Sequence, residues 1–218
     1  MAIKDVIAGV IAAAKYCLNS SIGTDRFLPL DRIISGEVHE YTVAATYSVK
    51  IPTTATQVQI IAVGGGGAGG SGNTWYDNSY ELQHGYGGGG GSGAYVNQTY
   101  TIDSAIKRTS IQVTVGAGGK GVSTEGATGG SGGSSIVSGI ITVPGGSGGS
   151  GYKNKQPGRT PNGGSGGSPG GNAGGSGSQS AVGTGGTSPY KSYGKGGNGG
   201  VIPGDDGADG YVYLKFLY

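Results

Sequence analysis

Apolar and polar residues alternate along several short stretches in the middle and at the end of the chain. A period of two places successive side chains on opposite faces of a strand, and these stretches are also rich in β-branched and aromatic residues. The pattern therefore predicts strands, with residues 52–54 as a turn between two of them. The predicted strands are residues 37–43, 46–51, 56–63, 94–102, 109–115, 135–143 and 211–218.

Strands of this number and spacing, with no long helical stretch among them, predict an all-β fold built as an antiparallel β-sandwich. Residues 5–18 follow a different pattern, with an alanine-rich run and apolar residues on one stripe, which predicts a short N-terminal helix. The apolar stripe of so small a helix must pack against another surface, either the β part of the same chain or a partner subunit. We therefore divide the chain into an N-terminal segment, residues 1–35, and a β domain, residues 36–218.

Glycine accounts for 53 of the 218 residues, mostly in runs and in triplets of two glycines and one other residue. A repeat of three fits polyglycine II, an extended helix with the path of polyproline II, whose amides and carbonyls all point outward. Such helices need neighbours as hydrogen-bond partners, and positions that face a neighbour have no room for a Cβ atom. The triplets therefore predict a bundle of polyglycine II helices carried by the sandwich, with every third residue facing solvent or a looser seam.

Composition excludes several classes of protein. A net charge of +2 does not indicate a nucleic-acid or membrane-surface binder. The longest apolar stretch, residues 6–14, is far shorter than the roughly twenty residues that a membrane-spanning helix requires. Cys17 is the single cysteine, so an intrachain disulfide is excluded, and its apolar neighbours favour a buried side chain over a nucleophile.

No motif predicts catalysis or a cofactor. Residues 64–69 match the pattern G-x-G-x-x-G, but no helix follows to receive a pyrophosphate. Asp205, Asp206 and Asp209 gather three carboxylates before the last strand, where we expect a solvated turn and leave cation binding open. The two histidines lie in no recognisable triad. The sequence thus predicts a protein with no enzymatic activity, no metal and no cofactor.

Recognition is expected where aromatic and cationic residues interrupt the glycine scaffold. Three interruptions, at residues 73–84, 152–159 and 189–193, are predicted to be loops at the turns of the bundle, and loops often carry function. The alternative is that each tyrosine only covers a neighbouring glycine seam. The candidate contact residues are Trp75, Tyr76, Tyr80, Tyr152, Lys153, Arg159, Tyr190, Lys191 and Tyr193.

The order of the blocks resembles a known family. The chain looks like the glycine-rich tip domains of bacteriophage tail fibres in the order of four segments. These are a strand that leads into residues 64–67, a glycine block that leads to Tyr95, residues 113–119, and residues 207–212 before a terminal strand. The resemblance spans roughly residues 46–218. The family includes the separate adhesin that caps the long tail fibres of T-even-like phages, in which polyglycine II helices form a sandwich and the loops contact outer-membrane proteins or surface glycans.

This resemblance implies a virion protein of the distal tail that binds a bacterial receptor, a surface protein or a glycan, without entering the membrane. The receptor would be contacted by the loops 73–84, 152–162 and 187–195, while residues 1–35 would attach to a tail-fibre or baseplate subunit. A homotrimer and a single chain on a trimeric fibre both fit. The alternatives are a purely structural fibre or cell-wall protein and an ice-binding protein, although the outward residues are irregular.

Overall fold

Ten strands form three antiparallel sheets in the computed structural model, which describes residues 36–103, 110–153, 169–188 and 190–218. One four-stranded sheet has the order β1-β10-β3-β6, a second has the order β2-β7-β8-β9, and β4 and β5 form a separate pair. The helix predicted at residues 5–18 lies outside the described residues. The strands are β1 (Val38–Tyr41), β2 (Thr46–Val49), β3 (Gln57–Val63), β4 (Asn73–Tyr76), β5 (Leu82–Gly85), β6 (Tyr95–Thr101), β7 (Ile111–Thr114), β8 (Ser135–Val137), β9 (Ile141–Val143) and β10 (Tyr211–Leu217).

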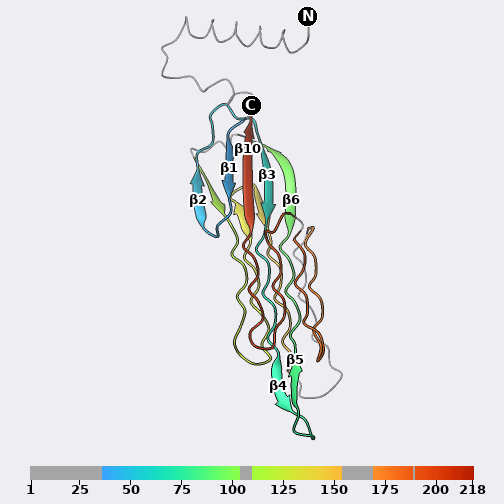
Figure 1. Cartoon of the computed structure of the whole chain (residues 1–218). Coiled ribbons are helices and arrows are strands. Elements are labelled where there is room, and N and C mark those ends of the chain that lie inside the picture. The colour runs from blue at the N-terminus through green and yellow to red at the C-terminus, as the bar shows by residue number, and fades with distance from the viewer. Residues whose placement is uncertain (1–35, 104–109, 154–168, 189) are drawn as a thin grey trace, which may run out of the picture.

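The two four-stranded sheets share one apolar core, which confirms the predicted sandwich. Alternate residues of the strands point inward, as the period of two requires, and Val58, Val113 and Leu214 are fully buried. The core is small and mostly aliphatic, with Phe216 as its largest buried member. The sandwich lies at one end of an elongated molecule, and the β4–β5 pair lies at the other (Figure 1).

One strand prediction and one loop prediction were wrong in detail. Residues 135–143, predicted as one strand, form the β8–β9 hairpin, because Gly139 adopts a φ of 79° and turns the chain back. Residues 73–84, predicted as a loop, contain most of the β4–β5 hairpin. In both places a turn of few residues joins strands too short for the alternating pattern to separate.

The glycine segments connect the two ends of the molecule, running side by side along its length (Figure 1). The segments continue the strands of the sandwich without a break, so that one end of each is already aligned by a sheet. Residues 64–72 follow β3, residues 116–121 follow β7 and residues 144–151 follow β9, while residues 86–94, 127–134 and 204–210 lead into β6, β8 and β10.

Backbone hydrogen bonds hold the glycine segments together, and every third amide of a segment donates to the same neighbouring segment. Successive amides of residues 64–71 donate in turn to three different segments, which run antiparallel to this one. Its carbonyls accept from further segments, including 144–152 and 194–200, so residues 64–72 are surrounded. The first three bonds are Gly64 N–H to Ala94 O (3.0 Å), Gly65 N–H to Gly133 O (2.9 Å) and Gly66 N–H to Ala208 O (2.8 Å).

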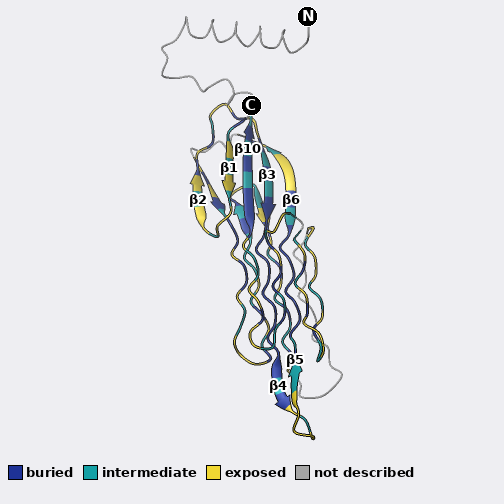
Figure 2. Cartoon of the chain, in the orientation of Figure 1, coloured by how far each residue is buried: buried dark blue, intermediate teal, exposed yellow. Residues whose placement is uncertain are grey.

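This arrangement is the predicted polyglycine II bundle, and steric fit explains its composition. A Cβ atom on Gly67 would lie 2.1 Å from the carbonyl oxygen of Ser147, and one on Gly90 would lie 2.1 Å from that of Gly67. Neither position can accept a side chain without separating two segments. The outer segments have room at every third residue, so Thr128 and Ser131 are exposed while the glycines of the central segments are buried (Figure 2).

Polar side chains complete the hydrogen bonding at the edge of the bundle. Asp209 Oδ1 accepts from the Gly118 amide at 2.8 Å, and Asp206 Oδ1 accepts from the Gly121 amide at 2.7 Å. The Asp206 carboxylate also accepts a hydrogen bond from the Lys120 ammonium. This bond, and after it the bond from the Gly121 amide, lowers the pKa of the Asp206 carboxyl group. The three carboxylates of the acidic cluster therefore form hydrogen bonds within the bundle, each with different partners.

Candidate functional site

The β4–β5 hairpin, residues 73–85, forms the end of the molecule that lies farthest from the sandwich (Figure 1). Its turn is organised by Asp77, whose carboxylate oxygen Oδ1 accepts from the amides of Ser79 and Glu81 at 2.9 and 3.0 Å. The other oxygen accepts from Gln83 Nε2 at 3.0 Å. Short aspartate-to-backbone bonds of this kind fix a turn. The turn is thus well defined although most of its residues face solvent.

Large side chains project outward from this hairpin. Tyr76 and Leu82 lie opposite each other on the two strands and therefore share a face, with exposed fractions of 69% and 51%. Tyr80 is held in a left-handed conformation with a φ of 62° and is 88% exposed. Among the described residues few large apolar side chains are so exposed. The hairpin therefore presents a small aromatic and aliphatic surface, the tip surface, defined as Tyr76, Tyr80 and Leu82.

The opposite face of the hairpin anchors it to the bundle. Trp75 stacks on Tyr152 with the ring centroids 5.9 Å apart and the planes at 6°. Trp75 is only 9% exposed and Tyr152 only 2%. The Tyr152 ring lies so close to Gly85 that a Cβ atom there would be 2.3 Å from it. The prediction that Trp75 and Tyr152 are surface contact residues is therefore wrong in this structure, because the tryptophan needs cover and the tyrosine supplies it.

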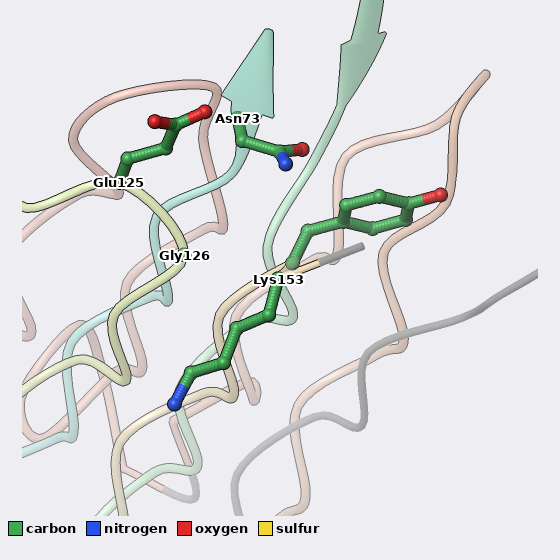
Figure 3. Close-up of a pocket in the computed structure, with 5 residues that line it drawn as sticks. Asn73, Glu125, Gly126 and Lys153 are labelled. Atoms are coloured by element: carbon green, nitrogen blue, oxygen red, sulfur yellow. The ribbon is translucent and has the colours of Figure 1, made fainter. Parts of the chain in front are cut away.

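A cavity of about 300 Å³ opens beside this anchor, lined by Asn73, Glu125, Gly126, Tyr152 and Lys153 (Figure 3). Asn73 is 2% exposed, and its Oδ1 atom has no hydrogen-bond partner among the described residues. A buried acceptor left without a partner costs about 1–3 kcal/mol. Gly126 has a φ of 66°, and a Cβ there would meet the Lys153 stem at 3.0 Å. The cavity thus depends on glycine at position 126.

The side chains around the cavity differ in exposure. Glu125 and Lys153 are exposed, and neither forms an ion pair with another described residue. In Figure 3 the Lys153 stem passes Gly126 and its ammonium group projects away from the Asn73 amide. Of these residues only Tyr152 and Lys153 were candidates from the sequence. Asn73 and Glu125 were missed because isolated polar residues beside glycine carry no sequence signal.

The remaining described candidates lie elsewhere, where the sandwich meets the bundle. Tyr190 stacks on Tyr95 at 5.7 Å, and Tyr193 stacks on Tyr211 at 4.6 Å. Tyr190 and Tyr193 are half-buried in these contacts. The alternative reading, in which a tyrosine covers a neighbouring seam, therefore describes both rings better than the predicted surface role. The Lys191 ammonium lies 5.3 Å from the centre of the Tyr190 ring, so it too faces the cluster.

Tyr211 is the centre of this cluster. It is 1% exposed, and its hydroxyl donates to Glu40 Oε1 at 2.9 Å. Burial raises the pKa of the Tyr211 hydroxyl well above its ordinary value of 10.0, and the hydrogen bond and negative charge of Glu40 raise the pKa further. Glu40 also lies 4.0 Å from the Lys191 ammonium. The cluster thus joins residues 190–193 to β1 and β10, which is a structural role.

Other sequence predictions can be compared with the structure directly. Arg159 lies outside the described residues. The amides of residues 64–69, which matched a dinucleotide motif, all donate to backbone carbonyls of neighbouring segments. Within residues 36–103, 110–153, 169–188 and 190–218, no three acidic, histidine or cysteine side chains come together to hold a metal ion. The same residues contain no helix with the length and hydrophobicity needed to cross a bilayer.

Comparison with known proteins adds one finding. A family model described as a glycine-rich domain matches residues 42–213, which is most of the chain. The chain belongs to this glycine-rich domain family. The matched range contains almost the whole sandwich, the bundle and the hairpin, so the family corresponds to the architecture described above. A search of curated proteins found no match.

Proposed function

We propose that this glycine-rich protein is a tip adhesin of a bacteriophage tail or tail fibre, which binds a receptor on the bacterial surface during host attachment. The observation that carries the proposal is the tip surface, three large side chains exposed on a well-defined hairpin at the far end of the bundle. Exposed aromatic side chains are common anchors of binding surfaces. The resemblance of the glycine blocks to phage tip domains supplies the biological setting.

The architecture suits such a role. The bundle is held by main-chain hydrogen bonds, so the exposed residues of the hairpin can change without altering the scaffold. In this proposal the protein acts by binding and has no enzymatic activity. The receptor is a surface protein or a glycan, residues 1–35 attach to a tail-fibre or baseplate subunit, and many copies on one virion strengthen weak single contacts.

Binding of the purified, fluorescently labelled full chain to a panel of bacterial strains tests the proposal. We expect at least one strain to bind the protein and the double variant Tyr76→Ala, Tyr80→Ala to bind roughly 30-fold more weakly, the effect of losing about 2 kcal/mol at an anchor. Thermal unfolding of the variant should be unchanged, because both side chains are exposed.

Val182→Ala is the matched control, since Val182 is also apolar and 42% exposed but does not belong to the hairpin. It should bind like the unmodified protein. Equal binding of the double variant and the unmodified protein would contradict the proposal and leave the purely structural alternative. An ice-binding role is not favoured by the outward residues, which include Lys120, Thr128 and Pro144 rather than one repeated type.

A further inference from the structure

We propose that the cavity beside the hairpin, lined by Asn73, Glu125, Gly126, Tyr152 and Lys153, binds one neutral sugar unit, a hexose or an N-acetylhexosamine, of a bacterial surface polysaccharide. This inference deepens the proposed function and rests on it for the source of the sugar. The site itself stands on the geometry of the cavity.

The unpartnered Asn73 Oδ1 atom is the first argument. The Asn73 side chain lines the cavity and is 2% exposed, and its Oδ1 atom is buried without a partner among the described residues. In this proposal a small shift of the lining lets a donor of the ligand reach that atom. Protein interiors pair nearly all such atoms, and an exception points to a missing group. A ligand hydroxyl or amide N–H would supply the donor.

The charges around the cavity define the ligand further. Glu125 presents a second strong acceptor, which favours a ligand with several donor groups (Figure 3). Its negative charge opposes an anionic ligand, and the ammonium of Lys153, on a flexible stem, opposes a cationic one. A neutral ligand that carries neighbouring hydroxyl groups meets all these conditions.

Size agrees with this class of ligand. A volume of about 300 Å³ accommodates one sugar ring rather than an extended chain, and lies at the small end of known ligand sites. Since Glu125 and Lys153 are exposed, the cavity is open on one side, so the remaining units of a polysaccharide could continue into solvent. The cavity lies at the same end of the molecule as the tip surface, where a receptor would be reached.

Titration of the ¹⁵N-labelled full chain by NMR tests the inference, with the methyl glycosides of glucose, galactose, mannose, N-acetylglucosamine and N-acetylgalactosamine as probes. We expect at least one of them to shift the amide signals of Asn73, Gly126 and Lys153 at millimolar concentration. Glucuronate and glucosamine, which carry a negative and a positive charge, should bind several-fold more weakly. If none of the neutral glycosides shifts these signals, the inference is wrong.

Two variants locate the binding. Asn73→Ala and Glu125→Ala should each weaken it about ten-fold, and Tyr80→Ala, which changes only the tip surface, should leave it unchanged. Glu125 is exposed, so its variant keeps the test decisive even if Asn73→Ala does not fold. Equal affinity of Glu125→Ala and the unmodified protein would overturn the assignment.

The two proposals can fail separately. If the tip-surface double variant loses binding to cells and no sugar shifts the cavity signals, the sugar site is wrong and the adhesin function stands. If a sugar binds the cavity but no bacterial strain binds the protein, the site stands and the adhesin function is wrong.

Discussion

Most glycines of the central segments leave no room for a side chain, because a Cβ atom would strike a backbone carbonyl oxygen of a neighbouring segment. Gly67 is buried between segments, with the Ser147 oxygen 2.1 Å from the place of a Cβ atom. Ala68, one residue later, is also buried and carries its methyl group, so the requirement concerns direction and not burial alone. At this scale the sequence is informative, because uninterrupted glycine runs mark the segments that neighbours surround and triplets mark the outer ones.

We predict that Gly67→Ala destabilises the protein by roughly 3 kcal/mol, the upper end of the cost of overpacking, because two segments must move apart. For a chain of this size the midpoint of thermal unfolding should fall by roughly 6–12 °C. Ser131→Ala, at an exposed outer position, is the control and should change stability by less than about 0.5 kcal/mol. Equal midpoints for both variants would contradict the steric argument.

Tyr211 makes a prediction about alkaline pH. Its pKa is raised above 10.0 in the folded protein, so the folded state holds the proton more tightly than the unfolded state. The stability that this provides is complete below pH 10 and is lost as the pH rises above it. The unfolding midpoint of the unmodified protein should therefore fall more steeply between about pH 10 and 12 than that of Tyr211→Phe. Parallel pH profiles of the two proteins would disprove the role of the hydroxyl.

The β4–β5 hairpin is the element that sequence reasoning described least well. Its residues were expected to form a recognition loop, and Trp75 was expected to be exposed, since an isolated tryptophan among glycines has no visible partner. The partner is Tyr152, which comes from a distant part of the chain and stacks on it at 5.9 Å. Such a pairing depends on how the segments are arranged in the bundle, which local patterns do not specify.

The strands of the sandwich were predicted well for the opposite reason. Residues 57–63 and 211–217 are rich in β-branched and aromatic residues, and polar residues alternate with apolar ones in part of each. The two strands pair along their whole length as β3 and β10. Residues 64–72 were also predicted correctly as polyglycine II, because the glycine pattern that predicts this conformation lies within the segment itself. The cavity beside the hairpin was not predictable, since Asn73 and Glu125 meet only through the fold.

The turn of the hairpin depends on Asp77, and we predict that Asp77→Ala loosens it without unfolding the protein. The amides of Ser79 and Glu81 would lose their acceptor, and hydrogen bonds to a charged group are worth about 1.5–3 kcal/mol. Exchange of these amides with deuterium should accelerate by at least about ten-fold. Asn78→Ala, at the exposed neighbouring position, should leave exchange unchanged, and an equal rate in both variants would contradict this role of Asp77.

The sandwich, the bundle and the hairpin follow one another along the length of the molecule, and each has a different structural role. The sandwich supplies the hydrophobic core, the bundle extends from it without one, and the hairpin closes the far end (Figure 1). Because the segments continue the strands directly, the sheets hold their ends and reduce the entropy lost in ordering so much glycine. The proposed recognition surface depends on this bundle being rigid.

Amide hydrogen exchange measured residue by residue tests that rigidity most directly. The amides of residues 64–71 and 86–94 donate to neighbouring segments at 2.8–3.0 Å and lie inside the bundle. We predict that they exchange as slowly as those of β3 and β10, through unfolding of the whole domain. Exchange at the rate of an unstructured glycine peptide would contradict the account, because the segments would then not be joined through their backbones.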